Sequence, residues 1–183
     1  MSALNFMLKC LMFWRKLYEK KVFNVFIGLI VFIILLIDQT TKYYAFHSLG
    51  EERKVVLIRS ILELTYIENT GAAFGSFAGQ NVAIMVAVIV IIVLLLLKYR
   101  RLCKTENYYN IRLAMAILMS GAVGNLIDRM IHGFVIDFIY FVPIDFPKFN
   151  FADICIVLSL LTISYNVLGL SNRTEAPEIS MWS

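Results

Sequence analysis

The chain has 183 residues, of which 60% are apolar and 16% are charged, and its mean hydropathy is +0.77. A water-soluble domain is excluded, because such domains average about 45–50% apolar and about 25% charged residues. The net charge of +4 requires no nucleic-acid partner, since the basic residues flank predicted membrane spans. We therefore expect a membrane protein.

Four apolar segments are long enough to cross the ~30 Å hydrocarbon layer, which needs about 20 helical residues. They cover residues 22–46, 81–97, 111–130 and 151–170. We predict an all-α membrane protein with four transmembrane helices and a small β-rich loop region outside the cytoplasm. The peptide chain then divides into a cytoplasmic N-terminal segment, a transmembrane domain and a cytoplasmic tail, which are residues 1–21, 22–170 and 171–183.

Lysine and arginine residues gather before the first span and between the second and third spans. The two groups are Lys9, Arg15, Lys16, Lys20 and Lys21, and then Lys98, Arg100, Arg101, Lys104 and Arg112. Such clusters mark the cytoplasmic loops of membrane proteins. Both termini should therefore be cytoplasmic, and the two remaining loops should lie on the outer face.

The two outer loops have different patterns. The first covers residues 46–68, and its stretch KVVLIRSILELTYIEN loosely alternates β-branched and polar residues, which predicts a small sheet on the membrane surface. The second contains Asp137 in GFVIDFIYFV, which Pro143 and Pro147 make too short for a span. We expect it to be a re-entrant or surface-lying stretch that carries Asp137 back to the bundle.

Polar residues gather at the outer end of the predicted bundle. They form the blocks DQTTK (38–42), ENTGAAFG (68–75), GNLIDR (124–129), VIDF (135–138) and FNFAD (149–153). A charge near the hydrocarbon costs at least ~2.5–3.5 kcal/mol on insertion scales. Several charges at one level therefore indicate a shared site.

Some of these residues have a structural explanation as well as a functional one. Asp38 and Lys42 are four residues apart and can pair on one helix face. The Asn-Thr-Gly sequence at 69–71 can form a tight turn or hold an extended peptide. Arg129 shares a helix face with Asp128, and it can either clamp Asp128 or bind a lipid phosphate.

Asp137 and Asp153 are candidates for a catalytic pair. Asn150 can cap the fourth helix, and the helix dipole favours a carboxylate such as Asp153 in the first turn. Capping explains Asp153 alone and says nothing about Asp137. Two carboxylates that lie close together at a low-dielectric interface share one proton, which is the chemistry of an aspartic protease.

The residues also allow two other candidates for the catalytic acid and one other class of protein. Asp128 adjoins Arg129, which would hold it ionised and suits a bracing role, and Asp145 lies between prolines, which favour a surface turn. Membrane carboxylates also serve as proton relays, as in a small proton-coupled transporter. A transporter needs polar groups at several depths, and the second span has none between residues 82 and 97. This favours an interfacial enzyme.

The five polar blocks, the third taken as GAVGNLIDR (121–129), resemble, in order and in topology, the signature blocks of bacterial lipoprotein signal peptidase, also called signal peptidase II. The resemblance covers about residues 22–170. It implies an aspartic endopeptidase of the bacterial cytoplasmic membrane with its active site at the outer face. The implied substrates are prolipoproteins that carry a diacylglyceryl-cysteine, cut just before that cysteine among membrane lipids. No metal or organic cofactor is implied.

The resemblance also implies roles for individual residues. Asp137 and Asp153 correspond to the catalytic pair. The residues that would line or support the substrate groove are Asn69, Gly71, Asn125, Arg129 and Asn150. Asp38 and Lys42 would brace the site, and we expect Asp128 to do the same.

Overall fold

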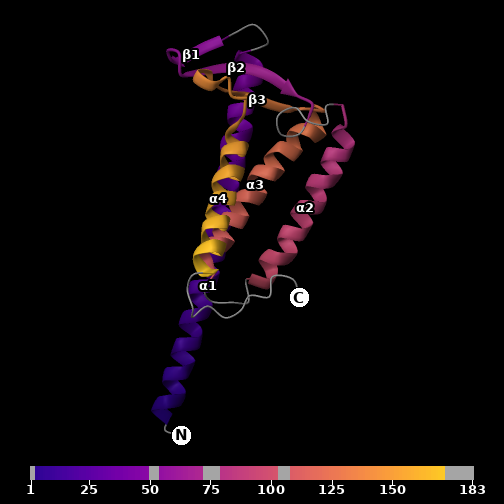
Figure 1. The fold of residues 1–183 in the computed structure, drawn as a ribbon. Coiled ribbons are helices and arrows are strands. Elements are labelled where there is room, and N and C mark those ends of the chain that lie inside the picture. Colours follow the sequence, from indigo (N-terminus) through magenta and orange to yellow (C-terminus); the bar gives the residue numbers. More distant parts are fainter. Residues whose placement is uncertain (1–2, 50–53, 72–78, 103–107, 172–183) are drawn as a thin grey trace.

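The computed structural model of the protein describes residues 3–49, 54–71, 79–102 and 108–171. These residues form four α-helices, a short 3-10 helix and a three-stranded sheet (Figure 1). The α-helices are α1 (Ala3–Ser48), α2 (Asn81–Leu102), α3 (Tyr109–Ile131) and α4 (Phe151–Ser171). The tail expected beyond α4 lies almost entirely outside the described residues.

Each α-helix contains a stretch that is long and apolar enough to cross a membrane, so the four predicted spans are confirmed. The helices extend beyond those spans, because α1 already begins at Ala3 and α2 continues to Leu102. Lysine and arginine are good helix formers. A basic segment next to a span can therefore lengthen the helix without lengthening the part that crosses the membrane. The hydropathy pattern therefore predicted the membrane-crossing parts better than the helix ends.

α3 lies at the centre of the bundle and packs against α1, α2 and α4. In its apolar window 44% of the residues are buried, against none in that of α2, which stands apart from α1 and α4 in Figure 1. Two glycines let neighbouring helices approach α3 closely. A Cβ atom on Gly121 would lie 2.6 Å from the carbonyl oxygen of Ala152, and one on Gly124 would collide with the Asp38 carboxylate.

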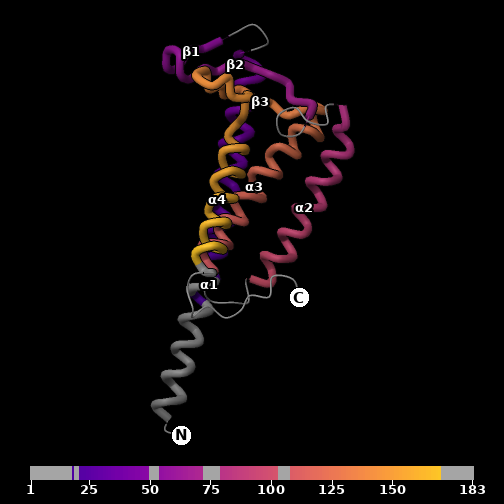
Figure 2. Tube along the Cα trace, in the orientation of Figure 1, coloured from indigo at the N-terminus to yellow at the C-terminus, as the bar shows by residue number. Residues whose placement is uncertain are grey.

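An antiparallel sheet covers the end of the bundle where α3 ends and α4 begins (Figure 2). Its strands are β1 (Lys54–Ile58), β2 (Leu62–Asn69) and β3 (Val135–Phe141), in that order across the sheet. The predicted sheet in the first outer loop is confirmed as β1 and β2. The third strand is the stretch around Asp137, which the sequence indicated only as re-entrant or surface-lying.

Two local features position β3 over the bundle. Gly133, with a φ of +85°, follows the last turn of α3 and directs the chain into the strand. Ile136 and Phe138 of β3 are buried against Ala45 and Leu49 at the end of α1 that adjoins the sheet. This apolar contact fixes the sheet on the bundle, and it holds Asp137, which lies between the two anchoring residues, at a defined place.

Candidate active site

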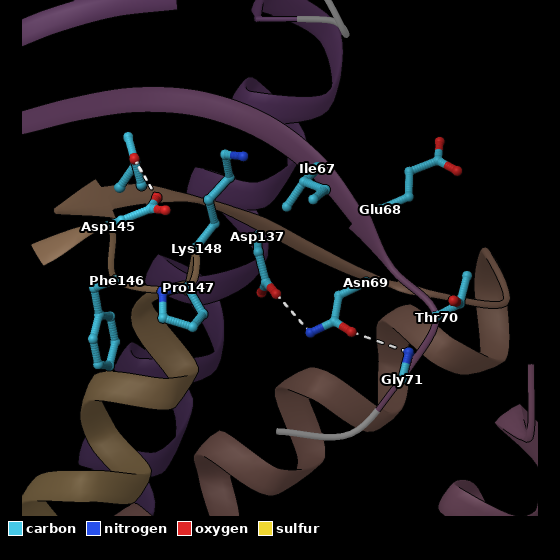
Figure 3. A pocket seen from close by; sticks show the side chains of 11 residues that line it. Ile67, Glu68, Asn69, Thr70, Gly71, Asp137, Asp145, Phe146, Pro147 and Lys148 are labelled. Atoms are coloured by element: carbon cyan, nitrogen blue, oxygen red, sulfur yellow. Dashed lines mark hydrogen bonds between the residues drawn. The ribbon is translucent and has the colours of Figure 1, made fainter. Parts of the chain in front are cut away.

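Asp137 lies in the middle of the candidate site, on β3. Its side chain is 2% exposed, and both carboxylate oxygens accept hydrogen bonds from amide side chains. Asn69, at the end of β2, donates from Nδ2 to Oδ2 at 2.8 Å (Figure 3), and Asn150 donates from Nδ2 to Oδ1 at 2.7 Å. The antiparallel pairing of β2 with β3 brings Asn69 to this carboxylate.

Asp153 is fixed by the start of α4. The Asp153 backbone N–H donates to Asn150 Oδ1 at 3.1 Å, and the Asn150 backbone N–H donates to Asp153 Oδ2 at 3.0 Å. This reciprocal pair is a capping box, so the expected cap is confirmed. The remaining oxygen, Oδ1, accepts a hydrogen bond from Nδ2 of Asn125 on α3 at 2.8 Å.

The two carboxylates are therefore joined through Asn150, which donates one hydrogen bond to each. Among the described residues, neither Asp137 nor Asp153 forms an ion pair with a lysine or arginine. Burial, and then the neighbouring charge of Asp153, raise the pKa of Asp137 to about 7, and the hydrogen bonds from Asn69 and Asn150 act in the opposite direction. A carboxyl in this state can hold or release a proton near neutral pH.

A second group of charges adjoins this pair through Asn125. Lys42 Nζ lies 3.0 Å from Asp38 Oδ2 and 2.9 Å from Asp128 Oδ2, and all three side chains are almost fully buried. The predicted pair of Asp38 with Lys42 is confirmed. Each of the two carboxylates also accepts a hydrogen bond from a backbone N–H group. Ala152 donates to Asp38 Oδ1 and Ile136 donates to Asp128 Oδ2, each at 3.1 Å.

The expected pairing of Asp128 with Arg129 is wrong. Neighbouring residues on a helix project about 100° apart, so the two side chains lie on different sides of α3. Asp128 faces Lys42, whereas Arg129 donates from Nη2 to the Gly71 carbonyl oxygen at 2.7 Å and from Nη1 to the Asn125 carbonyl oxygen at 3.2 Å. Arg129 thus holds the turn after β2.

The Asn-Thr-Gly sequence forms a tight turn, which was one of the two roles that its composition allowed. The Gly71 N–H donates to Asn69 Oδ1 at 3.0 Å, while the other end of the same amide binds Asp137. Together with the bond from Arg129, this contact fixes the orientation of Asn69. The residues that follow, 72–78, lie outside the described part of the chain.

Sequence reasoning missed one contact between predicted residues and one further residue. Lys42 also donates to Asn125 Oδ1 at 2.8 Å, which leaves the Nδ2 group of Asn125 to face Asp153. Gln39 donates to both Asp38 and Asp128, at 3.1 and 3.2 Å. Its polar side chain within an apolar span was the available signal, but its partner Asp128 lies on another helix, 89 residues away.

Two cavities meet at Asp137. The first, which we call the membrane groove, has a volume of about 600 Å³ and also contains Asn69, Asn125, Arg129 and Asp153. Its remaining walls are mostly apolar residues of α2, α3 and α4, namely Ile84, Val88, Ala122, Ile154, Ile156, Val157 and Leu158. The second, the sheet-side pocket, has a volume of about 330 Å³ (Figure 3).

The described residues contain no group of three or more His, Cys, Asp or Glu side chains that could hold a metal ion. The chemistry that the site offers from its own residues is proton transfer between two carboxyl groups. Amide donors hold both carboxyl groups in place, and a large apolar groove opens beside them. Such an arrangement can act on a polar bond that belongs to a largely apolar molecule.

Comparison with known proteins gives a consistent result. Residues 29–169 match the family model described as signal peptidase (SPase) II. A lipoprotein signal peptidase from Caldanaerobacter subterraneus subsp. tengcongensis is 41% identical over 138 residues, which cover 74% of this chain and 91% of the relative. One from Clostridium acetobutylicum is 34% identical over 157 residues, with 80% and 96% covered. A solved structure described as a bacterial membrane enzyme aligns with a TM-score of 0.71 at 28% identity, over 84% of this chain and 94% of that one.

Proposed function

This chain belongs to the signal peptidase II family, and we propose that it is an aspartic endopeptidase that cuts bacterial prolipoproteins just before a diacylglyceryl-modified cysteine. Asp137 and Asp153 form its catalytic pair. The observation that carries this proposal is that both carboxylates are held by neutral amides, line one groove and have no paired cation among the described residues.

The different surroundings of the two carboxyl groups support a division of roles. Asp137 is buried and has a pKa of about 7, so it starts as the protonated member, and Asp153 is half-buried and closer to water. Asp153 accepts a proton from a water molecule as that water attacks the peptide carbonyl carbon. Asp137 donates its proton to the carbonyl oxygen. As the C–N bond breaks, Asp153 gives its proton to the leaving amine and Asp137 recovers one from the diol.

The membrane groove supports a lipid-modified substrate. Its walls include Ile84 and Val88 on α2 and Val157 and Leu158 on α4, and these helices are long enough to cross a membrane. Acyl chains and an apolar signal segment can stay in such a groove without leaving the hydrocarbon. Asn69 and Arg129, which line the groove beside Asp137, supply donors for the peptide carbonyls near the cut.

The distribution of basic residues supports a site at the outer face of the cytoplasmic membrane. Arg100 and Arg101 lie in the last turn of α2, at the end of the bundle opposite the sheet (Figure 1). Basic residues favour the cytoplasmic side, so both termini are cytoplasmic and the sheet lies outside. In this arrangement Asp137 and Asp153 meet a substrate that has already crossed the membrane.

The test is conversion of a lipid-modified prolipoprotein to its mature form by purified variants in detergent. Asp137→Asn and Asp153→Asn should each lower cleavage by roughly 10²–10⁴-fold or more, because no neighbour can replace the proton that each handles. Glu63→Gln is the matched control, since Glu63 is a carboxylate of the same sheet that pairs with Lys54 and lines neither cavity. It should cleave normally.

Unchanged thermal midpoints for the two Asn variants would assign the loss to chemistry rather than to unfolding. Near-normal turnover by either variant would contradict the pair. Asp128→Asn is the third variant to test. If it folds and binds substrate but does not cleave it, while Asp137→Asn or Asp153→Asn still cleaves, the catalytic role belongs to Asp128.

A further inference from the structure

The sheet-side pocket is chemically different from the membrane groove, although both open at Asp137. It is formed by the end of β2, by β3 and by the segment that links β3 to α4, and its charged members besides Asp137 are Glu68, Asp145 and Lys148. The two cavities share Asn69, Asp137 and residues 146–148. A peptide that passes Asp137 can therefore have one part in each cavity.

Apart from Asp137, Lys148 is the one charged residue that lines both cavities, as far as the described residues show. It is half-buried, and its Nζ lies 5.4 Å from the centre of the Tyr140 ring. No carboxylate of the described chain lies within ion-pair distance of this ammonium group. In the view of Figure 3 its side chain lies between Asp145 and Asp137.

Apart from Asp137, the two carboxylates of the pocket are exposed and already accept hydrogen bonds. Tyr140 donates its hydroxyl to Asp145 Oδ1 at 2.6 Å, and Tyr66 donates to Glu68 Oε1 at 3.0 Å. Water screens exposed charges, whereas a half-buried ammonium group at the edge of an apolar groove keeps more of its field. Apart from Asp137, Lys148 is therefore the charge of the sheet-side pocket that a bound peptide would sense most strongly.

The direction of the substrate follows from the polarity of the cavities, and this step rests on the proposed function. The acyl chains and the signal segment are apolar, so they occupy the membrane groove. The polypeptide on the mature side of the cut is polar and has to leave the membrane, so it leaves through the sheet-side pocket. The residue directly after the modified cysteine then lies beside Lys148.

We propose that the sheet-side pocket binds the first residues on the mature side of the cleavage site, and that Lys148 makes this subsite select acidic over basic side chains. The selection acts on a charge that takes no part in the cleavage chemistry. It therefore changes how fast different prolipoproteins are processed without changing where they are cut.

The test uses three lipid-modified prolipoproteins that carry Asp, Asn or Lys directly after the modified cysteine and are otherwise identical. For the unmodified enzyme we expect kcat/KM to fall in the order Asp, Asn, Lys, with a spread of roughly fivefold between the extremes. Lys148→Met should abolish the spread, and Lys148→Glu should reverse it. Lys54→Met is the matched control, since Lys54 belongs to the same sheet, pairs with Glu63 and lines neither cavity.

The readouts separate this inference from the proposed function. Equal kcat/KM values for the three substrates with the unmodified enzyme would overturn the subsite while leaving the peptidase activity in place. A Lys148→Met variant that slows all three substrates by the same factor and keeps their order would overturn it as well. Absence of cleavage of every substrate would overturn both proposals together. Reversal by Lys148→Glu, with the order kept by Lys54→Met, is the result that the structure predicts.

Discussion

Two pairs of carboxylates lie next to each other at the end of the bundle that the sheet covers, and they are stabilised in different ways. Asp38 and Asp128 share the ammonium group of Lys42 at 3.0 and 2.9 Å. Asp137 and Asp153 receive only amide and backbone donors from Asn69, Asn125 and Asn150 among the described residues. The comparison suggests that the first pair braces the site and the second performs the chemistry.

The physical difference lies in the response to a proton. Protonation of a buried carboxylate that shares a buried cation would break an ion pair and leave the cation without its partner. A carboxylate held by neutral amides keeps hydrogen-bond partners in either protonation state, and a second carboxylate nearby favours binding of one proton. The same residue type can thus serve as a brace or as an acid within one small region.

The brace and the proposed catalytic pair are physically connected. Lys42 donates to Asn125 Oδ1, and Asn125 donates to Asp153. Asp38 accepts from the Ala152 N–H, one residue before Asp153, and Asp128 accepts from the Ile136 N–H, one residue before Asp137. The brace therefore fixes the backbone beside each proposed catalytic residue.

We expect the largest effect from a substitution at Lys42. Lys42→Met removes the shared cation and leaves Asp38 and Asp128 buried without compensation, so we expect a loss of about 3–5 kcal/mol in the free energy of unfolding. Cleavage should fall too, because Asn125 loses a partner that orients it. Thermal unfolding in detergent measures the first effect, and precursor cleavage by the folded fraction measures the second.

Lys54→Met provides the control for this loss. Lys54 also pairs with a carboxylate, Glu63, but its side chain is 54% exposed, and exposed pairs contribute only about 0–1 kcal/mol. A Lys42→Met protein that unfolds at the same temperature as the Lys54→Met protein would mean that Lys42 is no brace.

A smaller change tests the packing that places the brace. Gly124→Ala brings a methyl group into the Asp38 carboxylate, so either the carboxylate or the helix has to move. We expect a loss of about 1–3 kcal/mol, as for other overpacked buried sites. Gly28→Ala is the control, because no atom lies within 4 Å of its added Cβ and alanine is the better helix former. Equal thermal midpoints for the two variants would contradict the tight approach of α1 to α3.

Features set by local spacing could be predicted from the sequence. The spans follow from runs of apolar residues, the pairing of Asp38 with Lys42 follows from a four-residue helical spacing, and the cap by Asn150 follows from its place three residues before Asp153. The turn at Asn69 was predicted for the same reason. Each of these contacts joins residues that are close in the chain.

Features that depend on contacts between distant elements could not be predicted. The partner of Asp128 is Lys42, which is 86 positions away, whereas local reasoning selected the adjacent Arg129. β3 becomes a strand because β2 offers a free edge beside it, and the pattern around Asp137 does not show that edge. The family resemblance supplied the roles of such residues, but the contacts that explain those roles came from the fold.

The proton on Asp137 is the most direct test of the account. Infrared spectra of the purified protein, with Asp137→Asn as the reference, should show a protonated carboxyl band that is half lost near pH 7, because burial and the charge of Asp153 raise this pKa from 3.8 to about 7. Since the protonated form is required, kcat/KM should fall roughly tenfold per pH unit above that point. A carboxyl band of Asp137 that has already disappeared by about pH 5, near the ordinary range for aspartate, would contradict the account.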